Sequence, residues 1–152
     1  MWVVHEVRKW PLWKKSIYAL GFSNFFILGC FKCDGRSMIP TIEDSNTFVL
    51  VDYFSYKIMR KPFKKGDVVV ALSPGHFYRP VCKRICAMEG EEVCYVNPYN
   101  SQKERINIPE GHVWLLGDNP AESGDSRHYG PVRVGRIRGR LFWKLWPFEA
   151  IK

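Results

Sequence analysis

The pattern of hydrophobic and polar positions changes character early in this 152-residue chain. An uncharged, mostly apolar run covers residues 16–31 and is bounded by Lys15 and Lys32. From Asp34 onward, the apolar residues come in short runs separated by Gly, Pro, Asn and Asp. Short runs with such punctuation are typical of strands and turns. The pattern therefore predicts one mainly β domain that follows an apolar segment.

Short runs rich in Val, Ile, Phe, Tyr and Trp are predicted as strands because these residues favour a pleated, half-buried surface. They lie at residues 47–53, 67–72, 81–88, 92–96, 112–116 and 137–146. No long helical period follows the apolar run. The chain is also too short for a second large domain. We expect residues 33–152 to form a single all-β domain.

The apolar run at residues 16–31 is open to three interpretations. It is shorter than the ~20 residues that comfortably span a bilayer, so a short or tilted anchor, the core of a cleaved signal peptide and a buried helix all compete. Flanking basic residues and the tryptophans Trp10 and Trp13 favour the anchor. We therefore expect residues 1–32 to form a basic flank and a membrane-anchor helix, with the β domain on the opposite side of the membrane from the basic flank.

The formal net charge of +8 is compatible with a solvated surface, an anionic membrane or a nucleic acid. Lys and Arg are spread along the chain, and no zinc finger, helix-turn-helix or aromatic RNA-binding signature accompanies them. We expect contact with a membrane and none with nucleic acid.

The five cysteines do not form a recognisable framework. An odd number argues against a complete set of disulfides, and no His pair or second CxxC gives zinc spacing. Cys82, Cys86 and Cys94 are interpreted as small buried hydrophobes. A disulfide between Cys30 and Cys33 remains open. No metal or cofactor is expected.

The segment Gly35–Thr41 (GRSMIPT) contains a candidate nucleophile. Gly35 permits a positive φ two residues before Ser37, and Pro40 stiffens the chain after it. A serine on such a constrained turn can project its hydroxyl towards a bound carbonyl. By composition alone, an ordinary turn serine is the alternative.

A serine hydroxyl needs a partner base at neutral pH, and Lys83 is the candidate. If Val81–Ile85 is a strand, Lys83 shares a face with apolar neighbours while Arg84 points to the other face and stays solvated. Burial of the amine would lower its pKa towards the range useful to a base. The alternative is that both cations lie on the surface of an edge strand.

A third segment, residues 111–119 followed by 123–131, reads as a buried strand that ends in a polar, Gly-rich loop. Arginine suits a two-pronged clamp on a carboxylate, and a serine hydroxyl could orient a neutral lysine amine. A turn cluster held by local hydrogen bonds is the alternative. The candidate residues are Asp118, Ser123, Asp125, Ser126 and Arg127.

Together, the three segments resemble the signal peptidase family of Ser-Lys proteases. The serine segment resembles GxSMxPT, the lysine segment resembles in part KRVxGxxGD, and residues 117–131 resemble GDNxxxSxDSRxYGP. The resemblance covers Asp34 to the C-terminus. It implies a signal-peptidase-like β domain behind an N-terminal membrane-anchor helix.

Carried over residue by residue, the resemblance implies catalytic roles. Ser37 would be the nucleophile and Lys83 the general base. Ser123 would support the lysine, while Asp125 and Arg127 would hold the surrounding loop.

The same resemblance implies that Met38 lines the pocket for the small residue before the scissile bond. The chain departs from the family pattern in three places. Ala87 and Glu91 stand where Gly and Asp are usual, and Gly35 stands where some bacterial members carry a hydroxyl for the oxyanion. Backbone N–H groups such as that of Ser37 would then stabilise this charge.

Residues 111–119 (GHVWLLGDN), the cysteine before Lys83 and the C-terminal IRGR and KLWP are most similar to a mitochondrial inner-membrane branch of the family. The resemblance implies removal of sorting presequences from precursors delivered to the intermembrane space, with a homologous second subunit as partner. Alternatives are an inactive relative that stabilises a partner subunit and a bacterial or reticular type of signal peptidase.

Overall fold

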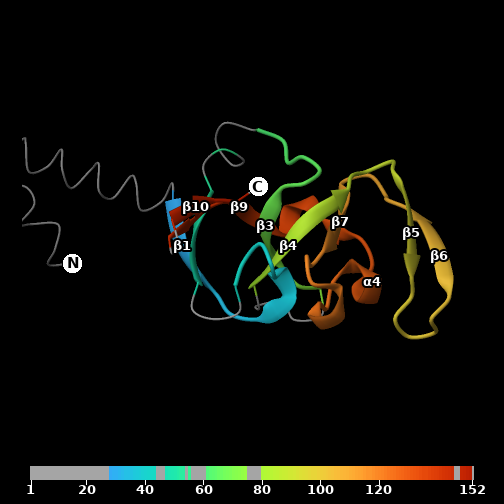
Figure 1. Cartoon of the computed structure of the whole chain (residues 1–152). Coiled ribbons are helices and arrows are strands. Elements are labelled where there is room, and N and C mark those ends of the chain that lie inside the picture. The colour runs from blue at the N-terminus through green and yellow to red at the C-terminus, as the bar shows by residue number, and fades with distance from the viewer. Residues whose placement is uncertain are drawn as a thin grey trace, which may run out of the picture.

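A computed structural model gives the three-dimensional structure of the chain. It describes residues 28–43, 47–53, 55, 61–74, 80–145 and 148–151. Figure 1 shows a curled sheet with short helical turns around it and a separate two-stranded ribbon at one end.

The main sheet has eight strands in the order β1-β2-β9-β3-β4-β7-β8, with β10 paired to β9, and all its pairs are antiparallel. Its strands are β1 (Leu28–Cys33), β2 (Thr47–Asp52), β3 (Val68–Leu72), β4 (Pro80–Ala87), β7 (His112–Leu116), β8 (Val132–Arg133), β9 (Ile137–Leu145) and β10 (Phe148–Ala150).

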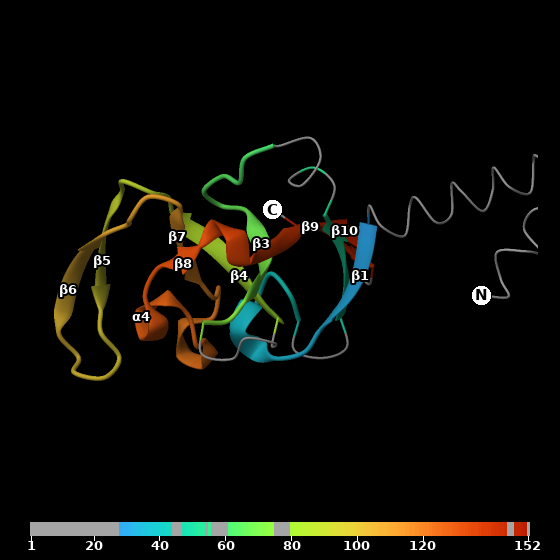
Figure 2. The same cartoon turned by 180° about the vertical axis from the view of Figure 1, so that it is seen from behind.

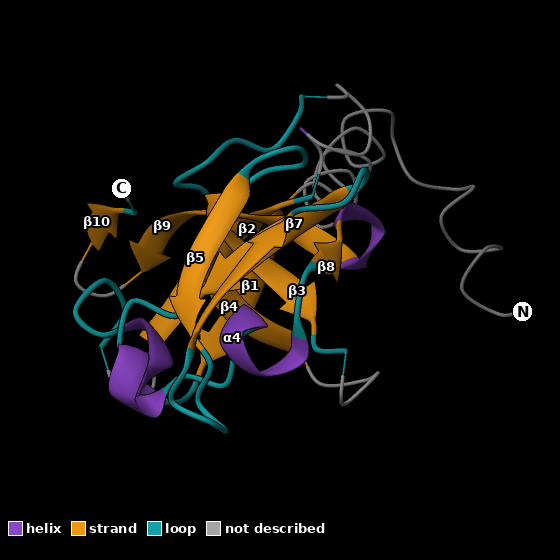
Figure 3. Ribbon diagram, turned by 90° about the vertical axis from the view of Figure 1, so that its right-hand side faces the viewer, coloured by secondary structure: helices purple, strands orange, loops and turns teal. Residues whose placement is uncertain are grey.

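A second sheet consists only of β5 (Glu92–Val96) and β6 (Lys103–Asn107). In both Figure 1 and the reverse view of Figure 2, this ribbon lies at the end of the molecule opposite β1 and β10. Within the described ranges, the helical elements are single turns, and Figure 3 shows them around the sheet. They are η1 (Arg36–Met38), η2 (Pro120–Glu122), α4 (Ser126–Tyr129) and η3 (Val134–Arg136).

Strand β3 separates two hydrophobic cores. Its side chains alternate between faces, so Val68 and Val70 join one core while Val69 and Ala71 join the other. A strand buried on both faces reads as a continuous apolar run, and β3 has the sequence VVVAL. Strand β4 pairs with β3, so the inward-pointing side chains of β4 lie in an apolar environment.

The six predicted strands are confirmed. The runs 92–96 and 112–116 keep their predicted bounds, and the other four shift by one residue at one or both ends. Strands β1, β6, β8 and β10 were not predicted. The sequence of β6, KERIN, offers Ile106 as its one large aliphatic residue, because this strand belongs to an open ribbon with a burial pattern that alternates between half-buried and exposed.

Strand β1 includes the last four residues of the apolar run that we interpreted as an anchor. Leu28–Cys33 pairs with β2 along its whole length, so the sheet begins before the predicted boundary between residues 32 and 33. A short apolar run cannot be assigned to helix or strand from its periodicity alone. The remainder of the run, residues 16–27, lies outside the described residues. Among the described residues, no helix is both long and apolar enough to span a bilayer.

Candidate active site

Ser37 lies on the single turn η1, which follows strand β1 after a two-residue connection. Gly35 adopts a φ of 118°, a conformation that an L side chain would strain, as the sequence predicted. Asn119 holds the turn from the other side of the site. Its backbone N–H donates to the Ser37 carbonyl oxygen at 3.0 Å, and its side-chain amide donates to the Arg36 carbonyl oxygen at 3.0 Å. The serine is therefore positioned by a segment more than 80 residues away in sequence.

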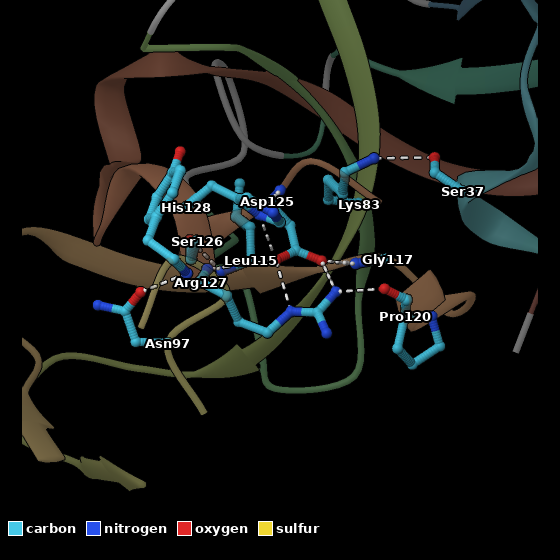
Figure 4. A network of polar contacts seen from close by, with 11 residues as sticks. Ser37, Lys83, Asn97, Leu115, Gly117, Pro120, Asp125, Ser126, Arg127 and His128 are labelled. Carbon is cyan, nitrogen blue, oxygen red and sulfur yellow. Dashed lines mark hydrogen bonds and ion pairs between the residues drawn. The ribbon is translucent and has the colours of Figure 1, made fainter. Parts of the chain in front are cut away.

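Lys83 reaches Ser37 directly. Its Nζ atom donates a hydrogen bond to Ser37 Oγ at 2.8 Å, and Figure 4 shows the amine extending from β4 towards the serine turn. Lys83 and Ile85 are both buried on the same face of the strand, as the alternation predicted, and Lys83 is only 3% exposed. The two residues that the sequence singled out are thus brought together.

Burial lowers the pKa of the Lys83 amine below its usual value, because desolvation disfavours the ammonium form. The negative charges of Asp125 and Asp118 oppose this effect and raise the pKa, as would thiolates at Cys82 or Cys33, but they do not outweigh burial. None of these groups forms a hydrogen bond or an ion pair to the amine among the described contacts. The site therefore favours a neutral amine next to an alcohol.

Asp125 and Arg127 form a clamp beneath the dyad. The guanidinium donates two parallel hydrogen bonds to the carboxylate, from Nε to Oδ1 and from Nη2 to Oδ2, each 2.9 Å long. Gly117 N–H also donates to Oδ2 at 3.1 Å. Although burial opposes ionisation of Asp125, which is 0% exposed, these bonds outweigh it and hold the pKa of this carboxyl below its usual value. The predicted loop scaffold is present, and Figure 4 shows it.

Ser123 and Ser126 have different surroundings. The Ser126 hydroxyl accepts a hydrogen bond from Leu115 N–H at 2.9 Å, so it is used to fix α4 against β7. The buried Ser123 hydroxyl lies close enough to Asp125 to help lower its pKa, yet within the described part of the chain it has no hydrogen-bond partner of good geometry. Its predicted contact with the lysine amine is therefore not made here, and its support of Lys83 stays a proposal.

Gly117 allows these groups to approach one another. A Cβ atom at this position would lie 2.5 Å from the Ser37 carbonyl oxygen and would also collide with the Ser123 side chain. The serine turn, the Ser123 loop and the end of β7 can be close together only because this residue has no side chain. The signal in the sequence was the glycine at the start of GDN.

A second clamp joins the three segments of the site. Arg84 donates from Nε and Nη2 to the two carboxylate oxygens of Asp118, both at 2.8 Å, and Thr41 Oγ1 also donates to this carboxylate. The prediction that Arg84 stays solvated is wrong, because its side chain is only 20% exposed and is fully engaged by the loop after β7. The signals in the sequence were an arginine directly after the candidate base, Lys83, and an aspartate directly after Gly117.

The dyad opens into a cavity of about 750 Å³. Met38 lines it as predicted and is 2% exposed. Other lining residues come from both sides of the serine turn, from β4 and from α4, and they include Phe31, Cys33, Ile42, Val81, Cys82 and Tyr129. The cavity therefore has a mixed polar and apolar lining and includes both Ser37 and Lys83 in its wall.

The interpretation of three cysteines as buried hydrophobes is wrong for Cys94, while Cys82 and Cys86 are half-buried, and the Cys30–Cys33 disulfide that the sequence left open is not formed. Cys94 is exposed and not a buried hydrophobe, because it lies on the open β5–β6 ribbon. Cys30 and Cys33 are three residues apart on a strand, so they point to opposite faces, and Cys33 contacts Cys82 instead. Over the described ranges, no group of three or more His, Cys, Asp or Glu residues could hold a metal ion.

Comparison with known proteins agrees with this arrangement. The family model described as "Signal peptidase, peptidase S26" matches residues 12–99 and 96–146. The mitochondrial inner membrane protease subunit 1 of Schizosaccharomyces pombe is 46% identical over 113 residues, which cover 74% of this chain and 70% of the relative. The protein of the same name from Mus musculus is 41% identical over 126 residues, 82% of this chain and 73% of the relative.

More distant matches have a bacterial origin. Signal peptidase I of Bacillus caldolyticus is 25% identical over 173 residues, 93% of this chain and 92% of the relative. A solved signal peptidase I from Enterococcus faecalis V583 is 23% identical, covers 53% of this chain and 97% of its own, and gives a TM-score of 0.46, a likeness too slight to add to the assignment. The family model and the two mitochondrial relatives carry the conclusion: the chain belongs to the signal peptidase family, peptidase S26.

Proposed function

We propose that this chain is a membrane-bound serine endopeptidase that cleaves presequences with Ser37 as nucleophile and Lys83 as general base. The proposal rests mainly on one observation, the 2.8 Å contact between Lys83 Nζ and Ser37 Oγ in a site where Lys83 is 3% exposed. A serine next to a buried amine with a lowered pKa has the partner that its hydroxyl needs for nucleophilic attack.

In the proposed reaction, neutral Lys83 accepts the Ser37 hydroxyl proton across this contact while Oγ attacks the carbonyl carbon of the scissile bond. The ammonium then protonates the leaving amine, and an acyl-enzyme remains on Ser37. Water attacks the ester with Lys83 again as base, which releases the carboxylate product and restores the serine. The Ser37 proton leaves with the amine product and a proton from water replaces it on the serine, so the cycle uses only this chain, the peptide and water.

The oxyanion would be stabilised mainly by backbone N–H groups at the serine turn, such as that of Ser37. Gly35 has no side chain to contribute a hydroxyl, so backbone donors are the available groups on this segment. The clamp of Asn119 on the carbonyl oxygens of Arg36 and Ser37 supports this role, because it fixes the orientation of the turn. A preorganised donor is worth more than one that must be oriented during reaction.

The substrate would lie in the cleft as an extended strand, with Met38 in the pocket for a small side chain before the scissile bond. Ser123 would orient the Lys83 amine during turnover, and the Asp125–Arg127 clamp would hold the loop that carries it. The buried position of Met38 and its place on the cavity wall support the pocket assignment.

Relatives named mitochondrial inner membrane protease subunit 1 support the location and the protease activity. We infer that the chain works at the mitochondrial inner membrane with its β domain facing the intermembrane space, where it removes sorting presequences. The word subunit in these names supports a complex, and we propose a homologous second peptidase subunit as the partner. The residues before β1, 1–27, would supply the basic flank and the anchor.

Ser37→Ala tests the mechanism. The complex carrying this variant and the wild-type complex are compared on a presequence peptide, and we expect the variant to lose cleavage by at least about 10³-fold, because the nucleophile is gone. Ser55→Ala is the matched control, since the Ser55 backbone N–H and not its hydroxyl makes the hydrogen bond to Asp52. Unchanged cleavage by Ser37→Ala would remove this residue from the mechanism, and an inactive wild-type chain would favour the structural-partner alternative.

The location is tested by protease protection. Externally added protease should leave the β domain intact in whole mitochondria and degrade it in mitoplasts, whose outer membrane is open. Protection in both preparations would place the domain on the matrix side and contradict the proposal.

A further inference from the structure

Two cysteine thiols meet beside the dyad although their strands are far apart in the sheet. Cys33 ends β1 and Cys82 lies in β4, and three other strands, β2, β9 and β3, separate β1 from β4 in the sheet order. The sheet curls so that both side chains face the same core, and their Sγ atoms are 3.2 Å apart. The contact therefore closes the curl of the sheet rather than joining neighbours in it.

Each thiol is close in sequence to one residue of the Ser37–Lys83 pair. Cys33 precedes Ser37 by four residues, and Cys82 directly precedes Lys83. Both also line the cavity that contains the dyad, although Cys33 is only 6% exposed. Both residues therefore border a space that a small reagent can enter.

The chemistry of the pair favours reaction at Cys33. The hydrogen bond with Cys82 lowers the pKa of the Cys33 thiol, burial opposes this, and the nearby Lys83 lowers the pKa further. The thiolate is the nucleophile in thiol–disulfide exchange. Cys82, whose pKa is raised by the same contact, keeps its proton until the second step.

We propose that Cys33 and Cys82 form a modification site, a dithiol that a disulfide-class oxidant converts to an intrachain disulfide joining β1 to β4 at the wall of the cavity. The inference goes beyond the proposed peptidase function and does not depend on it.

The exchange proceeds in two balanced steps. The Cys33 thiolate attacks one sulfur of the oxidant, which breaks the S–S bond of the oxidant, forms a mixed disulfide and releases the first thiolate. Cys82 then loses its proton to water and attacks Cys33 Sγ, which forms the Cys33–Cys82 bond and releases the second thiolate. Two protein thiols lose two electrons in total, and the oxidant becomes two thiols.

The cross-link should leave the dyad in place and stabilise the fold. The sulfur atoms are already in contact, so the strands that carry them need little movement. The bond would close a loop between residues 49 positions apart, which restricts the unfolded chain. The chain-entropy relation for a loop of this length corresponds to a rise of about 10 °C in Tm for a domain of this size.

Peptide mapping tests the proposal on the full chain in detergent. The protein is incubated with oxidised glutathione, remaining thiols are blocked with N-ethylmaleimide, and tryptic fragments are identified by mass spectrometry. We expect residues 33–36 linked to residues 66–83, a fragment that stays whole because Pro80 follows Arg79. Dithiothreitol should separate the two fragments and lower the Tm by about 10 °C.

Variants provide the controls. Cys82→Ser should trap glutathione on Cys33 as a stable mixed disulfide, and it should lose the shift in Tm. A Cys30→Ser, Cys94→Ser double variant removes the two exposed thiols and should keep both the link and the shift. If the wild-type fragments carrying Cys33 and Cys82 are each blocked separately by N-ethylmaleimide, or if glutathione is found only on Cys30 and Cys94, the proposal is wrong.

Discussion

Lys83 and Arg84 are consecutive cations on β4, and the two faces of this strand give them opposite surroundings. Lys83 points into a site where burial lowers its pKa and where its hydrogen bond goes to an uncharged hydroxyl. Arg84 points to a carboxylate, and its hydrogen bonds with Asp118 raise its pKa further. Because successive side chains of a strand point to opposite faces, β4 places an amine with a lowered pKa and a permanently charged guanidinium on opposite sides.

The same comparison explains why the structural cation is an arginine. A guanidinium forms two parallel bonds to a carboxylate and stays protonated at any physiological pH. A lysine changes its charge readily when it is buried, which a base requires and a clamp must avoid. The Asp125–Arg127 pair repeats this arrangement on the other side of the dyad.

The largest expected effect comes from removing the amine. Lys83→Met keeps the length and the apolar stem of the side chain but removes the proposed base, so cleavage of a presequence peptide should fall by at least about 10³-fold. Circular dichroism and gel filtration should be unchanged. Turnover near the wild-type rate would show that another group serves as base.

The pH dependence of kcat/KM should reveal the state of Lys83. Only the neutral amine can accept a proton, so activity should rise with pH through the lowered pKa of Lys83 and fall about tenfold per unit below it. The midpoint should lie below the ordinary lysine value of about 10.4. Tm measured over the same range separates this titration from unfolding. A rate that rises towards acid pH would contradict a lysine base.

Arg84→Met should act mainly on stability. It leaves the largely buried Asp118 carboxylate without its counter-ion, which should lower the free energy of unfolding by about 2 kcal/mol in denaturant titrations. Cleavage should fall by no more than about tenfold. Arg84→Lys is the matched control. The lysine keeps the positive charge but loses the second hydrogen bond to Asp118. The stability of Arg84→Lys should therefore lie between those of wild type and Arg84→Met. If Arg84→Met were as stable as wild type, the clamp would contribute nothing.

The smallest expected effect is a gain in stability from Lys83→Met. Because the pKa of Lys83 is lowered in the folded state, the unfolded chain binds more protons, and wild-type stability rises with pH between the folded pKa and about 10.4. The variant lacks this penalty, so its Tm should exceed the wild-type value at neutral pH, and the difference should shrink towards alkaline pH. A lower Tm for the variant at neutral pH would show that burial of the Lys83 amine does not destabilise the folded state.

Much of the fold could be predicted because the signals are local. The β-favouring residues of β2 and β4, the continuous apolar run of β3 and the glycine before Ser37 are each signals from residues close in sequence. The unpredicted strands are those with weak local signals. KERIN in β6 has little apolar content, and β1 is the end of an apolar run that could equally have been helical.

The sequence by itself determined which residues have the right chemistry: a serine on a constrained turn, a lysine between apolar neighbours, and arginines and aspartates near a glycine-rich loop. Only the tertiary structure decided that Lys83 touches Ser37, that Arg84 binds Asp118 and that Cys33 meets Cys82. The physical reason is that strand register and the curl of the sheet set these contacts, and both depend on packing between segments some 35 to 50 residues apart, a range over which the sequence carries no periodic signal.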